Sequence, residues 1–170
     1  PLPPSPAYER PPAMTLHQDR KIWGWGLSTY CVPPPLLDVA RAFLSARLGR
    51  ELPPPRPVPT LDALTMPPPV RAIPSELADL ATTDRFARAL HTYGKSFRDV
   101  VRALDGDFSC APDWVAFPRD ETQVIDVLDW ASRHNLAVVP FGGGTSVVGG
   151  VEPAVGGGYA GTISLDMERF

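Results

Sequence analysis

The stretch of this sequence best suited to chemistry is a glycine-rich loop, Pro140–Val147, which reads Pro-Phe-Gly-Gly-Gly-Thr-Ser-Val. Three consecutive glycines can adopt positive φ angles and turn several backbone N–H groups toward one point. A concave run of such donors binds anions, so the loop predicts a phosphate or pyrophosphate site. The hydroxyls of Thr145 and Ser146 would add donors. Arg169 is the only Lys or Arg from the loop to the end of the sequence, which leaves main-chain dipoles to hold the negative charge.

Neither of the two common glycine-rich phosphate motifs fits this loop. The dinucleotide fingerprint G-x-G-x-x-G needs a glycine where Val147 stands. The Walker motif, counted from Gly144, needs Lys and then Ser or Thr where Gly150 and Val151 stand. A flexible turn that binds no ligand is the alternative interpretation of a glycine run after a strand. The apolar strand before the loop and the rigid Pro140 at its start favour a binding site.

The segments around the loop predict a strand, a helix, a second strand, the loop and a third strand. The two apolar strands on either side of the helix should be parallel, with a right-handed connection. Asp120 and Gln123 suit a capping box for that helix, and Asn135 suits its left-handed exit. The predicted strands are 114–117, 136–139 and 162–165, and the predicted apolar residues of the helix are Val124, Ile125, Leu128 and Ala131.

Two further helices are predicted upstream of these strands. One covers 36–48, between Pro35 in its first turn and Gly49 at its C-terminal end. The other begins after Ser96, which forms a capping pair with Asp99, and it ends at Gly106. Its apolar stripe consists of Phe97, Val100, Val101 and Leu104.

The N-terminal half is rich in proline and suggests a division of the chain into four parts. We expect residues 1–20 to be a disordered leader. Residues 21–74 are expected to form a helical and proline-rich segment, and its last part, 50–74, should be a semi-rigid extended connector. Trp23 and Trp25 are too apolar to remain in water and should dock on the domain that follows. Residues 75–107 predict a helical lead-in, and residues 108–170 a folded domain that looks like a piece of a longer protein.

The charge, hydropathy and cysteine content of the sequence exclude several classes of protein. Sixteen basic and 19 acidic side chains give a net charge of −3, which argues against a nucleic-acid or anionic-membrane partner. No apolar run approaches the roughly 20 residues that span a bilayer, and the N-terminus lacks a secretory signal. Cys31 and Cys110 are too few and too isolated to predict a metal or redox site, so we expect no metal and a cytoplasmic protein with reduced thiols.

Residues 108–170 resemble the first half of the flavin-binding domain of the vanillyl-alcohol-oxidase and para-cresol-methylhydroxylase (PCMH) superfamily. The resemblance is carried by Pro112–Pro118, the crossover helix and Val139–Val147. It implies an α+β, PCMH-type FAD-binding fold in which the loop wraps the diphosphate of FAD. The FAD-contacting residues that it implies are Pro140, Phe141, Gly142, Gly143, Gly144, Thr145, Ser146 and Val147.

The upstream segments narrow the resemblance to one group of enzymes. Residues 21–26 are similar to a Lys-x-x-Gly-Trp-Gly motif of the alkylglycerone-phosphate (alkyldihydroxyacetonephosphate) synthases, and residues 84–96 are similar to bacterial relatives of those enzymes. The implied activity is exchange of the acyl group of an acylated dihydroxyacetone phosphate for a fatty alcohol, without net redox change. The implied partners are FAD and a small-molecule or lipid substrate, with a homodimer expected for the full-length protein.

The same loop also serves flavin oxidases and dehydrogenases of 2-hydroxy acids, which is the second hypothesis. A third is an inactive remnant whose proline-rich segment docks on aromatic grooves of partner domains. Members that link flavin covalently often carry a His beside the loop, where Phe141 stands here, so the resemblance implies non-covalent FAD. The sequence provides no nucleophile, general base or metal cluster, which leaves the chemistry to the flavin and the catalytic residues unidentified.

The remaining candidate residues favour structural roles. We expect His91 to be a structural or solvent-bonded histidine, and His134 to stabilise the C-terminal end of the crossover helix. Trp114 and Trp130 are expected in the core, and His17 lies in the predicted leader.

Overall fold

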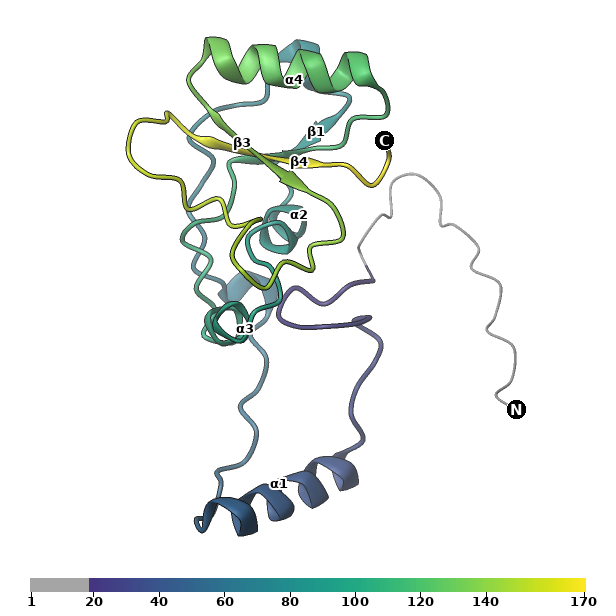
Figure 1. Cartoon of the computed structure of the whole chain (residues 1–170), viewed down its shortest axis with the longest axis vertical. Coiled ribbons are helices and arrows are strands. Elements are labelled where there is room, and N and C mark those ends of the chain that lie inside the picture. The colour runs from purple at the N-terminus through teal and green to yellow at the C-terminus, as the bar shows by residue number, and fades with distance from the viewer. Residues whose placement is uncertain (1–18) are drawn as a thin grey trace, which may run out of the picture.

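A four-stranded mixed sheet forms the centre of the computed structural model, which describes residues 19–170 (Figure 1). Helices lie on both sides of this sheet, which confirms the predicted α+β class. The predicted leader, apart from Asp19 and Arg20, falls outside the described residues, and so does His17. The strands are β1 (Ala81–Thr82), β2 (Trp114–Ala116), β3 (Ala137–Phe141) and β4 (Thr162–Asp166), in the spatial order β1-β2-β4-β3.

The two strands that flank the crossover helix are parallel, as predicted, but they are not neighbours. Strand β4 lies between β2 and β3, and Ser164 at its centre is paired with Val115 on one side and Val139 on the other. All three strands therefore end at the same edge of the sheet. The unpredicted strand β1 adds to β2 in the antiparallel direction.

The crossover helix α4 (Glu121–Arg133) covers one face of the sheet (Figure 1). Asn135 adopts the predicted left-handed exit with a φ of 56°, and the Asp120 side chain accepts the Gln123 amide. The predicted capping box is only half formed, because the Gln123 side chain accepts the Arg119 amide and not that of Asp120. The buried face of the helix differs from the predicted one: Ile125 and Leu128 are exposed by 48% and 44%. The predicted Ala131 is buried against the sheet and Val124 packs partly buried on the same cluster, while Val127 and Trp130 take the places expected for Ile125 and Leu128.

Helices α2 (Arg85–Leu90) and α3 (Phe97–Leu104) lie on the side of the sheet opposite α4 (Figure 1). The predicted capping box of α3 is present in both directions between Ser96 and Asp99. The predicted apolar stripe does not form the buried face, since Phe97 is 86% exposed while Asp99 and Ala103 are buried. Asp99 is accommodated because its carboxylate accepts bonds from Ser96 and from Arg102.

The apolar interior is divided between two clusters. The larger lies between α4 and the sheet and contains Trp114 and Trp130, which confirms both predicted core tryptophans. His134, as predicted, ends α4: its ring stacks on Trp130 and its Nδ1 bonds the Trp130 carbonyl oxygen at 2.8 Å. The smaller cluster joins α2 and α3 to the proline-rich segment, and its buried members are Leu64, Ala89, Tyr93, Ala103, Phe108 and Ala111.

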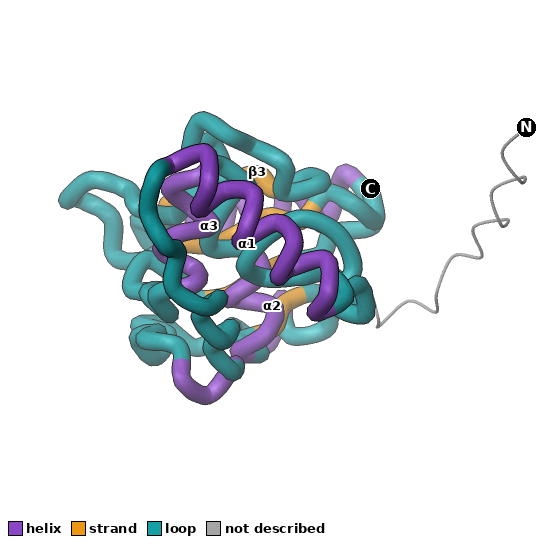
Figure 2. The backbone as a smooth tube through the Cα atoms, turned by 90° about the horizontal axis from the view of Figure 1, so that it is seen from below, coloured by secondary structure: helices purple, strands orange, loops and turns teal. Residues whose placement is uncertain are grey.

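Helix α1 (Pro34–Leu48) confirms the helix predicted for 36–48 and begins two residues earlier. Gly49 ends it with a φ of 63°. None of its residues is buried, and it lies at the end of the described structure opposite α4 (Figure 1). From below, α1 is the helix in front of the rest of the chain (Figure 2).

The proline-rich segment is bound to the folded domain from Arg56, whose guanidinium lies 2.7 Å from the Asp105 carboxylate, and the prediction of an extended connector did not include such contacts. It contains a short 3-10 helix, η1 (Leu61–Ala63), and a second one, η2 (Ser75–Leu77), follows directly after the segment. Leu64 is 5% exposed, and its carbonyl accepts a bond from the Arg85 guanidinium at 2.6 Å.

Cys31 and Cys110 both carry free thiols. Within the described range, none of the helices combines the length and apolar character needed to cross a bilayer. The described residues also contain no group of three or more His, Cys, Asp or Glu side chains placed to hold a metal ion.

Candidate functional site

The glycine loop begins where β3 ends, and Phe141 determines its first turn. The Phe141 side chain is buried, and Gly144 has a φ of +65°. A Cβ added to Gly144 would lie 2.5 Å from the Phe141 Cζ atom, so both the backbone angle and the close ring require glycine there.

Gly142 and Gly143 are needed for a different reason, because neither has a positive φ. No described atom lies within 4 Å of a Cβ added to Gly142, and a Cβ added to Gly143 would meet only the Thr145 methyl group, at 3.8 Å. The open space beside these two glycines allows a ligand to approach the main chain.

The amides of this part of the loop are available to a ligand. Among the described residues, none of the N–H groups of Gly142–Thr145 donates to a backbone carbonyl. The loop is closed further on by the Ser146 hydroxyl, which accepts the amides of Val148 and Gly150 at 3.4 and 3.0 Å. The structure thus has the free backbone donors that an anion site requires.

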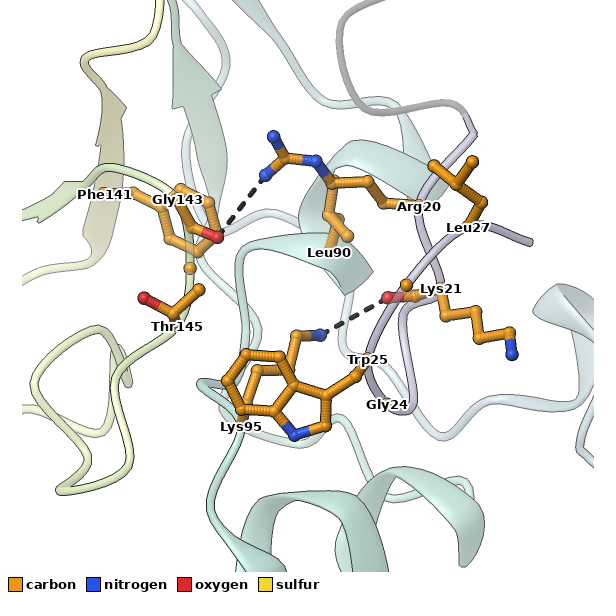
Figure 3. Close-up of a pocket in the computed structure, with 12 residues that line it drawn as sticks. Arg20, Lys21, Gly24, Trp25, Leu27, Leu90, Lys95, Phe141, Gly143 and Thr145 are labelled. Atoms are coloured by element: carbon orange, nitrogen blue, oxygen red, sulfur yellow. Dashed lines mark hydrogen bonds between the residues drawn. The ribbon is translucent and has the colours of Figure 1, made fainter. Parts of the chain in front are cut away.

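A cavity of about 300 Å³ lies against the loop (Figure 3). Of the eight predicted site residues, Phe141, Gly143, Gly144 and Thr145 line it, and Pro140, Gly142, Ser146 and Val147 do not. The opposite walls come from segments distant in sequence: Leu90 and Lys95, and six residues between Arg20 and Leu27.

The N-terminal wall is a small turn in which Arg20 pairs with Leu27 and the Lys21 amide donates to the Gly26 carbonyl at 3.1 Å. The docking predicted for the two tryptophans holds for Trp23, which packs on the smaller apolar cluster. Trp25 is 57% exposed and lines the cavity instead (Figure 3).

The segment between α2 and α3 contacts the loop through its main chain. The Lys95 amide donates to the Ser146 carbonyl oxygen at 2.6 Å. A Cβ added to Gly94 would overlap that same oxygen, so only glycine allows this approach. The contact was not predicted, and its only sequence signal was the short run Gly94-Lys95-Ser96.

Two cations from outside the loop face the cavity, although the loop has no basic residue of its own. Arg20 donates from Nη1 to the Gly143 carbonyl at 3.4 Å and lies 3.7 Å from Glu168. The Lys95 ammonium donates to the Lys21 carbonyl at 3.3 Å (Figure 3). Burial, and then the positive charge of Arg20, lower the pKa of Lys95, while Asp99 opposes the shift. The main-chain dipoles are therefore not the only positive groups here.

A buried polar pair connects α2 with the end of β4 beside the loop. His91 Nε2 lies 2.8 Å from Asp166 Oδ2, and His91 Nδ1 donates to the Ala87 carbonyl at 2.7 Å. Both side chains are almost fully buried, and the His91 ring centroid is 4.1 Å from that of Phe141. His91 is therefore buried and hydrogen-bonded within the protein, and its ring contacts the Phe141 ring that determines the turn at Gly144.

These groups fit the diphosphate of FAD. A diphosphate needs several backbone donors, space beside the main chain and positive charge. The amides of Gly142–Thr145 are the backbone donors, and the open sides of Gly142 and Gly143 give the space. Arg20 and Lys95 supply the positive charge.

Comparison with known proteins agrees with this fit. Residues 112–170 match the family of the FAD binding domain. An alkyldihydroxyacetonephosphate synthase of Trypanosoma brucei brucei is 39% identical over 112 residues, which are 62% of this chain and 18% of that protein. A mitochondrial D-lactate dehydrogenase [cytochrome] of Arabidopsis thaliana is 35% identical over 91 residues, 54% of this chain and 14% of that one.

A solved alkyldihydroxyacetonephosphate synthase structure superposes with a TM-score of 0.73 at 26% identity, and the match covers 95% of this chain and 33% of that one. The chain spans less than a fifth of the length of the curated synthases it matches. Residues 112–170 therefore match the FAD binding domain family, which indicates FAD as the cofactor, in a chain that is similar to the alkyldihydroxyacetonephosphate synthases.

Proposed function

We propose that the loop Pro140–Val147 binds the diphosphate of FAD within an enzyme of the alkylglycerone-phosphate synthase type. The observation that supports this most directly is the open main chain at Gly142 and Gly143, with amides that no described carbonyl occupies. In this proposal residues 108–170 are the first part of the FAD-binding domain, and 75–107 are its helical lead-in.

In this function the described residues bind and orient the cofactor. Backbone amides of the loop hold the diphosphate, and Thr145 donates its hydroxyl beside them. Phe141, fixed by His91, keeps Gly144 in the conformation that leaves those amides open. The bound flavin supplies the electronic chemistry.

The proposed reaction replaces the acyloxy group of an acylated dihydroxyacetone phosphate by the alkoxyl group of a fatty alcohol. The acyl chain leaves as a fatty acid, so there is no net oxidation. The support is the similarity to synthases over both the loop domain and the N-terminal turn, since the match to the solved synthase covers 95% of the chain. We place this protein in the cytoplasm, as a homodimer with non-covalent FAD.

A second candidate function is oxidation of a 2-hydroxy acid, which the similarity to a D-lactate dehydrogenase favours. Assays on the protein expressed from its full gene separate the two. Alkyl incorporation from a radiolabelled fatty alcohol into acyl-dihydroxyacetone phosphate is expected, without dye reduction by D-lactate. Dye reduction without alkyl incorporation would establish the dehydrogenase instead.

The loop assignment is tested by Gly143→Val. An added Cβ meets no backbone atom within 4 Å, so the fold should persist while the valine occupies the space for the diphosphate. We expect the purified protein to lose most of its FAD, measured from the flavin absorbance per protein. Gly157→Val is the matched control, because that glycine also has open space and no positive φ. Full flavin content in Gly143→Val would refute the assignment.

A further inference from the structure

We propose that Lys95 and Arg20 form a cationic wall that binds the diphosphate of FAD from the side of the cavity opposite the glycine loop. This inference rests on the proposed function of the loop. It assigns a role in cofactor binding to two residues that precede the FAD binding domain family match, which begins at residue 112.

The first support is the charge that the loop lacks. A diphosphate carries about two negative charges, and a charge taken out of water needs a partner of opposite sign. Arg169, the only Lys or Arg that follows the loop in this sequence, has its guanidinium over the Phe117 ring at 5.3 Å, and Arg133, the nearest Lys or Arg before the loop, lies in the last turn of α4. A cation from another segment can therefore supply the side-chain charge that the loop lacks.

The second support is where the cations point. Arg20 and Lys95 come from segments 75 residues apart and line one cavity with Gly143 and Gly144. Lys21 also lines it, but its ammonium extends away from the loop (Figure 3) and lies 5.0 and 5.3 Å from the ring centroids of Trp23 and Tyr30. The cavity thus receives two of the three basic side chains of its rim.

The third support is the incomplete pairing of Lys95. Its ammonium donates to the Lys21 carbonyl, and no carboxylate of residues 19–170 forms an ion pair with it. Asp99 is occupied by the Ser96 amide and by Arg102. Two like charges on one cavity repel each other, and a bound anion between them converts that repulsion into attraction.

The fourth support is that both cations are fixed to the loop they would assist. The Lys95 amide holds the Ser146 carbonyl, and the Arg20 guanidinium holds the Gly143 carbonyl. The wall and the loop therefore keep their relative positions, and a diphosphate between them would be bound from two sides.

The test measures FAD affinity by fluorescence titration of the flavin-free protein, expressed from its full gene. Lys95→Met keeps the aliphatic stem and removes the charge, and we expect FAD to bind about tenfold or more weakly, as is typical for a lost charged hydrogen bond. Lys95→Arg should restore most of the affinity. Arg98→Met, which removes a positive charge from an exposed position of α3, is the matched control and should bind like the wild type.

Salt distinguishes a charge effect from a structural one, because ions screen the attraction. The loss in Lys95→Met should shrink between about 0.05 and 0.5 M NaCl. An unchanged affinity, or a loss that salt does not alter, would overturn the inference. If Lys95→Met binds normally while Gly143→Val does not, the cationic wall is wrong and the loop assignment stands. If both variants bind normally, the loop assignment is wrong as well.

Discussion

Gly94 and Ser146 lie in direct backbone contact, which joins the segment before α3 to the glycine loop. The Ser146 carbonyl accepts the Lys95 amide at 2.6 Å, and there is no room at Gly94 for a Cβ beside that oxygen. Fifty-two residues separate the two positions in sequence. The loop is therefore positioned by an element outside its own strand–helix–strand unit.

Gly94→Ala tests this contact. The methyl group forces the two segments apart, and we expect the free energy of unfolding to fall by about 1–3 kcal/mol, as for overpacked interiors. Urea unfolding followed by tryptophan fluorescence measures the change. Gly156→Ala, where no described atom lies within 4 Å of the added methyl group, should unfold like the wild type. Equal stability of the two variants would show that the contact yields without cost.

Asp113 holds two chain segments together before β2. Its carboxylate accepts the amides of Val70 at 2.6 Å and Thr162 at 2.7 Å. Asp113→Ala leaves both donors without their partner, so we expect a loss of about 2 kcal/mol or more in the free energy of unfolding. Asp126→Ala, on the exposed side of α4, is the control and should change it by less than about 0.5 kcal/mol.

The His91–Asp166 pair is expected to behave as a coupled unit. Removing one side chain leaves the buried polar group of the other without its hydrogen-bond partner, which typically costs about 1–3 kcal/mol. We expect His91→Phe and Asp166→Asn each to be strongly destabilising, and the double variant to lose less than the sum. A double-mutant cycle from urea unfolding measures this coupling. Additive losses would contradict it.

The ionised Glu152 side chain is expected to stabilise the fold, and this contribution is lost at acidic pH. Hydrogen bonds from Arg102, at 2.6 and 2.9 Å, lower the pKa of Glu152 below its ordinary value of 4.5. Its contribution is therefore fully present above pH 4.5 and is lost as the pH falls through the lower folded-state value.

The measurement compares the wild type with Glu152→Gln. The wild type should be more stable near pH 7, and the difference in free energy of unfolding should shrink below pH 4.5 as the carboxyl group protonates. Glu121→Gln, at an exposed position of α4, is the control and should follow the wild type closely. A constant difference across this range would mean that the ion pair does not contribute.

The sequence by itself determined the local features. Caps and turn residues act on backbone groups within about four positions, so Asp120, Ser96, Asn135 and Gly49 could be assigned from their neighbours. The strands around the loop were visible as short apolar runs, and the loop itself as a glycine run after a strand. The resemblance to FAD-dependent enzymes rested on this same local stretch.

Only the tertiary structure decided what depends on distant partners. Periodicity shows that a helix has an apolar side, but not which side packs, and so Phe97 and Leu128 are exposed while Val127 is buried. The place of β4 between β2 and β3 depends on pairing across the sheet. Lys95 reaches the glycine loop through the bond of its amide to the Ser146 carbonyl, and Arg20 through the bond of its guanidinium to the Gly143 carbonyl, and sequence spacing relates neither segment to the loop.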